Sequence, residues 1–101
     1  MTIESFTIET FSEQLNTGFR VRLGEADAIE AQLVEVVDNG TSPEQERFSL
    51  LFRLPRNLPP AQGLYTVEHE KLGEFGLFLV PNRQDKQGMY YEAVFNRLRE
   101  V

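Results

Sequence analysis

The stretch GEFGLFLVP, residues 73–81, constrains the fold more than any other part of the chain. Its apolar residues do not alternate with polar ones, so a strand formed here has two apolar faces. Strands of this kind are typical of parallel sheets covered by helices on both sides. No helical pattern of suitable length flanks the stretch, so we predict a long antiparallel strand instead. Its inward residues are Phe75, Leu77 and Leu79, and its outward residues are Gly76, Phe78 and Val80.

Five further segments carry the two-residue period of strands. In 28–37 the phase changes between Leu33 and Val34, which is what a β-bulge produces. In the segment 47–54 the apolar residues Phe48, Leu50 and Phe52 share one face. The predicted elements are one helix at about 7–16 and strands at about 19–23, 28–37, 47–54, 63–68, 74–81 and 88–98.

The N-terminal segment has the spacing of a short amphipathic helix. Thr7 is a suitable N-cap, and Phe6 before it can pack on Phe11 as a hydrophobic staple. Gly18 is suited to the left-handed residue that ends a helix. The apolar face of this helix consists of Ile8, Phe11 and Leu15.

A chain of 101 residues has the size of one domain, which we assign to residues 1–101. Six short strands separated by turn signals predict a mainly β fold, a single small antiparallel β-barrel or a strongly curved sheet. We prefer a barrel with the helix plugging one end. The outward face of 74–81 is then covered by another subunit, whereas a helix lying over the sheet would cover that face itself.

The net charge of −6 is unevenly distributed along the chain. Residues 1–46 contain ten acidic residues and two arginines, whereas residues 47–101 contain six acidic and eight basic residues. Because arginine favours bidentate pairing with carboxylates, we predict ion pairs between the two halves. The acidic balance disfavours nucleic-acid binding, which relies on basic patches.

Two further exclusions concern compartment and cysteine chemistry. The chain contains no cysteine, which rules out disulfides and thiolate metal sites. MTIESFTIETF lacks the basic start and apolar run of a signal peptide. No apolar stretch approaches the roughly 20 residues of a membrane helix. We therefore expect a protein that does not insert into membranes and is cytoplasmic, the alternative being export by a route that uses no cleavable signal.

His69 is the only histidine, so any imidazole chemistry depends on it. Glu68 and Glu70 point away from His69 if the strand continues, which makes the tripeptide a poor metal site. We expect His69 to cap a turn or to hydrogen-bond a neighbouring loop. No serine lies in a nucleophile elbow. The sequence thus predicts no catalytic, cofactor-binding or metal-binding residue, and no cofactor.

Four motifs carry a resemblance to a known family: ETF, QERFSLLFRLP, EHEKLGEFGLFLVP and YEAVFNRL, in that order. This combination resembles a family of short bacterial proteins, similar in length to this chain, that is catalogued only as a domain of unknown function. The resemblance implies a β-rich fold and supplies no catalytic residues. Some members are encoded near proteins with phage-tail-collar domains, which implies a part in tail-like or surface assemblies.

The leading functional hypothesis is a non-enzymatic interaction or assembly module that binds a protein partner or itself. Soluble proteins that expose large apolar patches usually use them for interaction. One alternative is a β-barrel that holds a small apolar ligand inside, and another is a hydrolase-type enzyme that uses His69. The candidate interface residues are Phe78, Val80, Tyr90, Val94 and Leu51.

Overall fold

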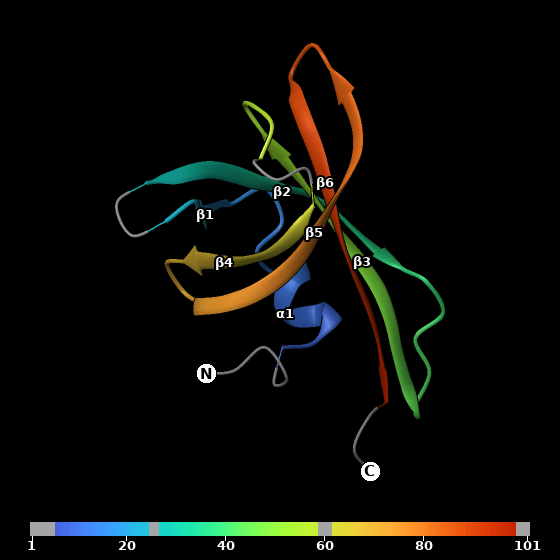
Figure 1. Ribbon diagram of the computed structural model, residues 1–101. Coiled ribbons are helices and arrows are strands. Elements are labelled where there is room, and N and C mark those ends of the chain that lie inside the picture. Colours follow the sequence, from blue (N-terminus) through green and yellow to red (C-terminus); the bar gives the residue numbers. More distant parts are fainter. Residues whose placement is uncertain (1–5, 25–26, 59–61, 99–101) are drawn as a thin grey trace.

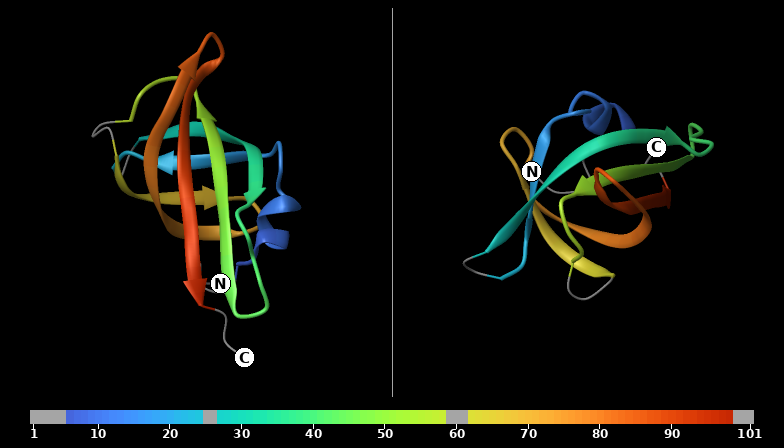
Figure 2. Two further views of the ribbon diagram at one scale, coloured as in Figure 1. Left: turned by 90° about the vertical axis from the view of Figure 1, so that its right-hand side faces the viewer. Right: turned by 90° about the horizontal axis from the view of Figure 1, so that it is seen from above.

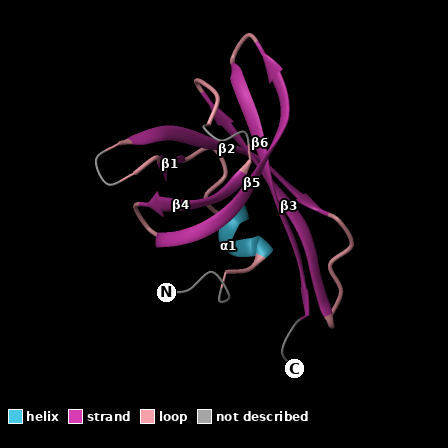
Figure 3. Ribbon diagram, in the orientation of Figure 1, coloured by secondary structure: helices cyan, strands magenta, loops and turns pink. Residues whose placement is uncertain are grey.

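Six antiparallel strands form one sheet that closes on itself in the computed structural model, which describes residues 6–24, 27–58 and 62–98 (Figures 1 and 3). The strand order is β1-β2-β3-β6-β5-β4, and β1 closes the barrel by pairing with both β2 and β4. The mainly β fold class is thereby confirmed. The elements are α1 (Ile8–Ser12), β1 (Gly18–Arg22), β2 (Ala28–Asp38), β3 (Gln45–Leu54), β4 (Gly63–His69), β5 (Gly73–Asp85) and β6 (Gly88–Leu98).

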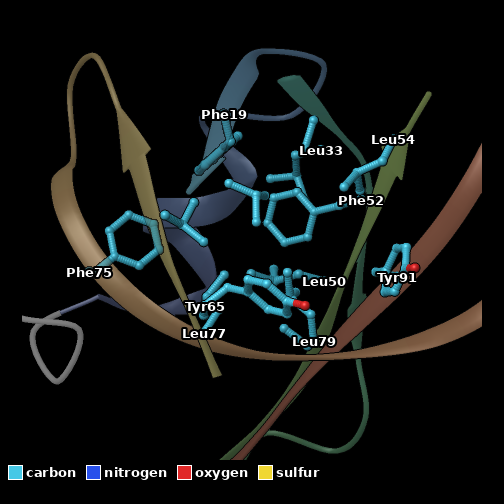
Figure 4. Packing of buried hydrophobic residues seen from close by; sticks show 14 of the residues in the cluster. Phe19, Leu33, Leu50, Phe52, Leu54, Tyr65, Phe75, Leu77, Leu79 and Tyr91 are labelled. Atoms are coloured by element: carbon cyan, nitrogen blue, oxygen red, sulfur yellow. The ribbon is translucent and has the colours of Figure 1, made fainter. Parts of the chain in front are cut away.

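The barrel interior is filled by the inward residues of every strand (Figure 4). In β3 the predicted inward residues Phe48, Leu50 and Phe52 belong to the core cluster, although Ser49 and Leu51 on the other face are buried as well. The period-two prediction is confirmed in β5, where Phe75, Leu77 and Leu79 are buried. Edge-to-face aromatic pairs join strands across the interior, for example Phe19 and Phe52 with ring centroids 5.2 Å apart. Residues distant in sequence therefore form one continuous core.

Two register shifts let the strands bend into a barrel. In β2 the pairing with β3 slips between Leu33 and Glu35, which confirms the predicted bulge. In β5 a second shift lies between Pro81 and Arg83. We predicted that this strand ends at residue 81, and it continues to Asp85. Because proline is tolerated in a strand at a bulge, where no ladder hydrogen bond is needed from its nitrogen, the strand survives Pro81.

The short helix plugs one end of the barrel. Thr7 caps it by accepting a hydrogen bond from the backbone N–H of Thr10 at 3.3 Å. The predicted staple is also confirmed, because the Phe6 and Phe11 rings pack edge-to-face at 5.6 Å. Both rings are fully buried and contact the inward ring of Phe75, at 5.2 and 6.2 Å.

The helix is shorter than the predicted 7–16. It ends at Ser12, and the chain continues through turns to Asn16, which has a φ of 68°. Asn16 therefore supplies the left-handed residue that we assigned to Gly18, and Gly18 begins β1. Leu15 lies beyond the helix and is exposed, so it is not part of the apolar helical face.

Three ion pairs are present among the described residues, and each joins the acidic half to the basic half of the chain. Arg97 Nε lies 2.7 Å from a carboxylate oxygen of Glu46, and the Arg97 guanidinium also donates to the carbonyl oxygen of Phe6. This pair therefore ties the segment before the helix to β3 and β6. The other two pairs are Arg22 with Glu68 at 3.1 Å and Arg56 with Asp27 at 3.9 Å.

Candidate interaction surface

The outer face of β4, β5 and β6 carries an apolar stripe, which we define as Leu64, Phe78, Val80 and Val94. Leu64 lies directly opposite Phe78 in the β4–β5 pairing. Val80 lies opposite Glu92 on β6, so Val94, two residues further along, is its diagonal neighbour on the same face. Leu64 is 74% exposed, Phe78 54% and Val94 64%, and Val80 is half-buried. The stripe therefore crosses three neighbouring strands.

The helix does not cover this stripe. Phe11 packs against Phe48, Phe75 and Phe95 at the end of the barrel, so its side chain is part of the core. In the left view of Figure 2, β3 and β6 face the viewer and the helix lies to one side of them. The alternative in which the helix covers the outward face of β5 is therefore wrong, and the outer apolar residues of β5 face solvent in the described chain.

Two of the five candidate interface residues are not available at the surface. Tyr90 is 4% exposed, because it lies opposite Arg53 and Arg83 and the guanidinium carbon of Arg83 stacks 4.2 Å from the ring centroid. Leu51 is 7% exposed, opposite Glu35 on β2 and Glu92 on β6. Long charged side chains can cover apolar neighbours with their aliphatic stems. Tyr90 and Leu51 are thus removed from the candidate interface.

Leu64 was missing from the prediction although it is more exposed than any residue that we named. The signal was present in LYTVE, where Tyr65 and Val67 share the buried face and Leu64 must point outward. The sequence could not show that Leu64 lies opposite Phe78, because the register of β4 on β5 is a property of the folded sheet. Leu64 therefore completes the stripe.

His69 has a structural position at the β4–β5 turn, as predicted. Its Nδ1 accepts hydrogen bonds from the backbone N–H groups of Lys71 at 3.0 Å and Leu72 at 3.3 Å. Its Nε2 therefore carries the proton and donates to Thr17 Oγ1 at 2.9 Å, which in turn donates to the carbonyl oxygen of Gln14 at 2.7 Å. The ring also packs on Phe19, with centroids 4.3 Å apart.

Burial lowers the pKa of His69 below its ordinary value of 6.5, although nearby Glu70 acts in the opposite direction. The neutral imidazole is thus the form that the folded protein favours. Both nitrogens of the imidazole are occupied by hydrogen bonds to the protein.

The remaining surface of the described residues has shallow, open clefts. One cleft beside His69 is lined by Arg20, Glu30, Glu68 and Glu70. Among residues 6–24, 27–58 and 62–98, no three histidine or acidic residues gather in a group that could hold a metal ion. The interior, where a small apolar ligand would bind, is occupied by the side chains of the core cluster (Figure 4). No helix within the described part of the chain is long and apolar enough to cross a membrane.

Comparison with known proteins places the chain in a family. Residues 6–95 match the family model described as "Domain of unknown function (DUF6916)". No curated protein and no solved structure matches the chain. The match begins at Phe6 of the staple and ends at Phe95, whose ring packs on Phe11 and Phe48. It therefore includes the helix plug, the barrel and the apolar stripe, and the chain belongs to this family of unknown function.

Proposed function

We propose that the protein is a non-enzymatic interaction module that binds a protein partner through the apolar stripe. One observation carries this proposal: Leu64, Phe78 and Val94 are more than half exposed on one face of three neighbouring strands, and no described element covers them. Scattered exposed apolar residues need no explanation, whereas a contiguous group on a rigid sheet is typical of an interaction site.

The charge around the stripe favours a protein partner over a lipid surface. Glu92 lies beside Val80, and Glu74 lies two residues from Gly76 on the same strand face as Phe78. The chain as a whole carries a net charge of −6. Anionic membrane surfaces attract basic segments and repel acidic ones. The resemblance to the family with tail-like genomic neighbours favours an assembly of phage-tail-like or surface type as the setting.

Site-specific photo-crosslinking in the native host tests this proposal. A photoreactive phenylalanine analogue placed at Phe78 should give defined crosslinked protein species. The same analogue at Glu13, which is exposed at the end of the helix, should give none. Equal crosslinking at both positions, or none at Phe78, would contradict the proposal. The masses of the products separate a second copy of this chain from any other protein.

A further inference from the structure

The outer face around Val94 has opposite charges on its two sides. In the β2–β3–β6 ladder, Val94 lies opposite Ser49, and Ser49 lies opposite Val37. Two residues along the strands in one direction, Glu35 and Glu92 lie on either side of Leu51. We refer to these three residues, which lie side by side across the strands, as the row Val37–Ser49–Val94. Two carboxylates lie on one side of this row.

The other side of this row carries a positive charge. Arg47 follows two residues from Ser49 in the opposite direction, and it lies opposite Asn96 on β6. The carboxylates and the guanidinium are thus each displaced by two residues from the row, about 7 Å along the strand direction. Val37 is 37% exposed and Val94 64%, so the row between the two charges is accessible at both ends.

These three charges have no ionic partner within the described chain. None of the three ion pairs between described residues includes Glu35, Arg47 or Glu92. Arg47 uses its guanidinium to donate to the side-chain oxygen of Gln45 at 2.9 Å, which leaves its charge uncompensated. Arg47 and Glu35 are exposed, and Glu92 is half-buried. The fold therefore leaves an acidic pair and a cation separated by the uncharged row Val37–Ser49–Val94.

Such an arrangement is self-complementary under a two-fold rotation. Consider a two-fold axis that runs along the row Val37–Ser49–Val94. Rotation about it places the same outer face of a second copy against the first, and it reverses positions along the strand direction. The Arg47 of each copy then lies over Leu51 of the other, between Glu35 and Glu92, while Val94 faces Val94. Closed dimers require a patch that complements itself in this way. A chain with a net charge of −6 otherwise repels its own copy.

We propose that the partner of this surface is a second copy of the same chain, related by a two-fold axis along the row Val37–Ser49–Val94. This inference rests on the proposed function and adds the identity and orientation of the partner. Phe78 lies on the same outer face as Val94, two residues from Val80, so the apolar stripe extends the contact beyond the row. The apolar residues contribute affinity, and the charges select the orientation.

Charge reversal tests the arrangement directly. Two variants are made, Arg47→Glu alone and Glu35→Arg combined with Glu92→Arg. In either homodimer the facing charges have the same sign, so we expect self-association about tenfold weaker than in the wild type, because each dimer contains the contact twice. Lys86→Glu makes the same change in net charge as Arg47→Glu, at the exposed β5–β6 turn, and should associate like the wild type.

Mixing the two variants gives the decisive result. In a mixed dimer, the carboxylate introduced by Arg47→Glu faces the two arginines introduced in the other chain. The unaltered Arg47 of that other chain faces the unaltered Glu35 and Glu92, so both contacts regain opposite charges. With one variant labelled with heavy isotopes, native mass spectrometry should show a mixed dimer and almost no homodimer. A misfolded variant could not be rescued in this way, and circular dichroism of each variant alone confirms its fold.

Three outcomes overturn the inference: a wild type that stays monomeric, an Arg47→Glu variant that dimerises normally, or a mixture that forms no mixed dimer. If the analogue at Phe78 crosslinks to other proteins while the purified chain stays monomeric, the proposed function survives and the two-fold dimer does not. If Phe78 gives no crosslinks at all, the proposed function fails as well.

Discussion

The two faces of β5 have similar apolar residues and opposite surroundings. Phe75 and Phe78 are three residues apart on one strand, yet Phe75 is 6% exposed and Phe78 is 54% exposed. Phe75 is covered by Phe6 and Phe11, which the N-terminal segment brings to the end of the barrel. Phe78 lies opposite Leu64, which is itself largely exposed. One face of this strand is therefore part of the core, and the other is exposed and forms the proposed binding face.

Truncating each phenylalanine should separate the two faces most strongly. Phe75→Ala should lower the free energy of unfolding by about 3–5 kcal/mol, because it leaves a cavity beneath the helix plug. Phe78→Ala should change it by no more than about 0.5 kcal/mol, because the ring is largely in solvent. Denaturant unfolding at a concentration below self-association measures both values. Similar losses for the two variants would contradict the division of β5 into a core face and an exposed face.

Removing the contacts that anchor the helix plug to the end of the barrel should lower the free energy of unfolding by less than Phe75→Ala does. Arg97→Met removes the ion pair with Glu46 and the hydrogen bond to the carbonyl of Phe6. We expect a loss of about 1.5–3 kcal/mol, the range for charged hydrogen bonds that are partly buried. Arg22→Met is the matched control, because its pair with Glu68 is more exposed and should contribute about 0.2–1 kcal/mol. Equal losses in denaturant unfolding would show that Arg97 does not anchor the plug.

Acidification should lower the free energy of unfolding through protonation of His69. The folded pKa of this group lies below its unfolded value of 6.5 because of burial. Stability from the neutral ring is therefore fully present above about pH 6.5 and is lost as pH falls toward the folded pKa. Asp38 and Asp85 accept backbone hydrogen bonds that lower their pKa values below 3.8, so their contribution is lost at lower pH.

The single histidine makes this prediction simple to measure. The ring resonances of His69 in nuclear magnetic resonance should titrate below pH 6.5. The unfolding free energy of His69→Gln should not change between pH 6.5 and pH 5 by the amount seen in the wild type. A titration midpoint above 6.5, or an identical pH dependence in both proteins, would rule out the hydrogen-bonded neutral ring.

Local patterns in the sequence were sufficient for the inner half of the structure. The period of two placed Phe48, Leu50 and Phe52 inward, and the phase change after Leu33 located the bulge of β2. The Thr7 cap and the Phe6–Phe11 staple could also be predicted, because each joins residues that are only a few positions apart in the sequence. Each of these features depends on neighbours along the chain.

The outer half depended on neighbours across strands, which a single sequence does not reveal. Tyr90 was predicted to be exposed, and Arg83 covers it only because the bulge after Pro81 brings the two residues opposite each other. Leu51 is buried between Glu35 of β2 and Glu92 of β6, and this position depends on the register of both pairings. Leu64 joins Phe78 through the register of β4 on β5. The candidate interface could therefore be predicted for its centre at Phe78 and Val94, and not for its limits.

Sedimentation velocity over a concentration series, with wild type and Phe78→Glu, tests the central claim most directly. We expect the wild type to shift from monomer to dimer as concentration rises. Phe78→Glu should remain monomeric with an unchanged free energy of unfolding, because this side chain lies on the proposed binding face and outside the core. A wild type that remains monomeric up to high micromolar concentrations, or a variant that dimerises equally well, would contradict the assignment of this face to self-association.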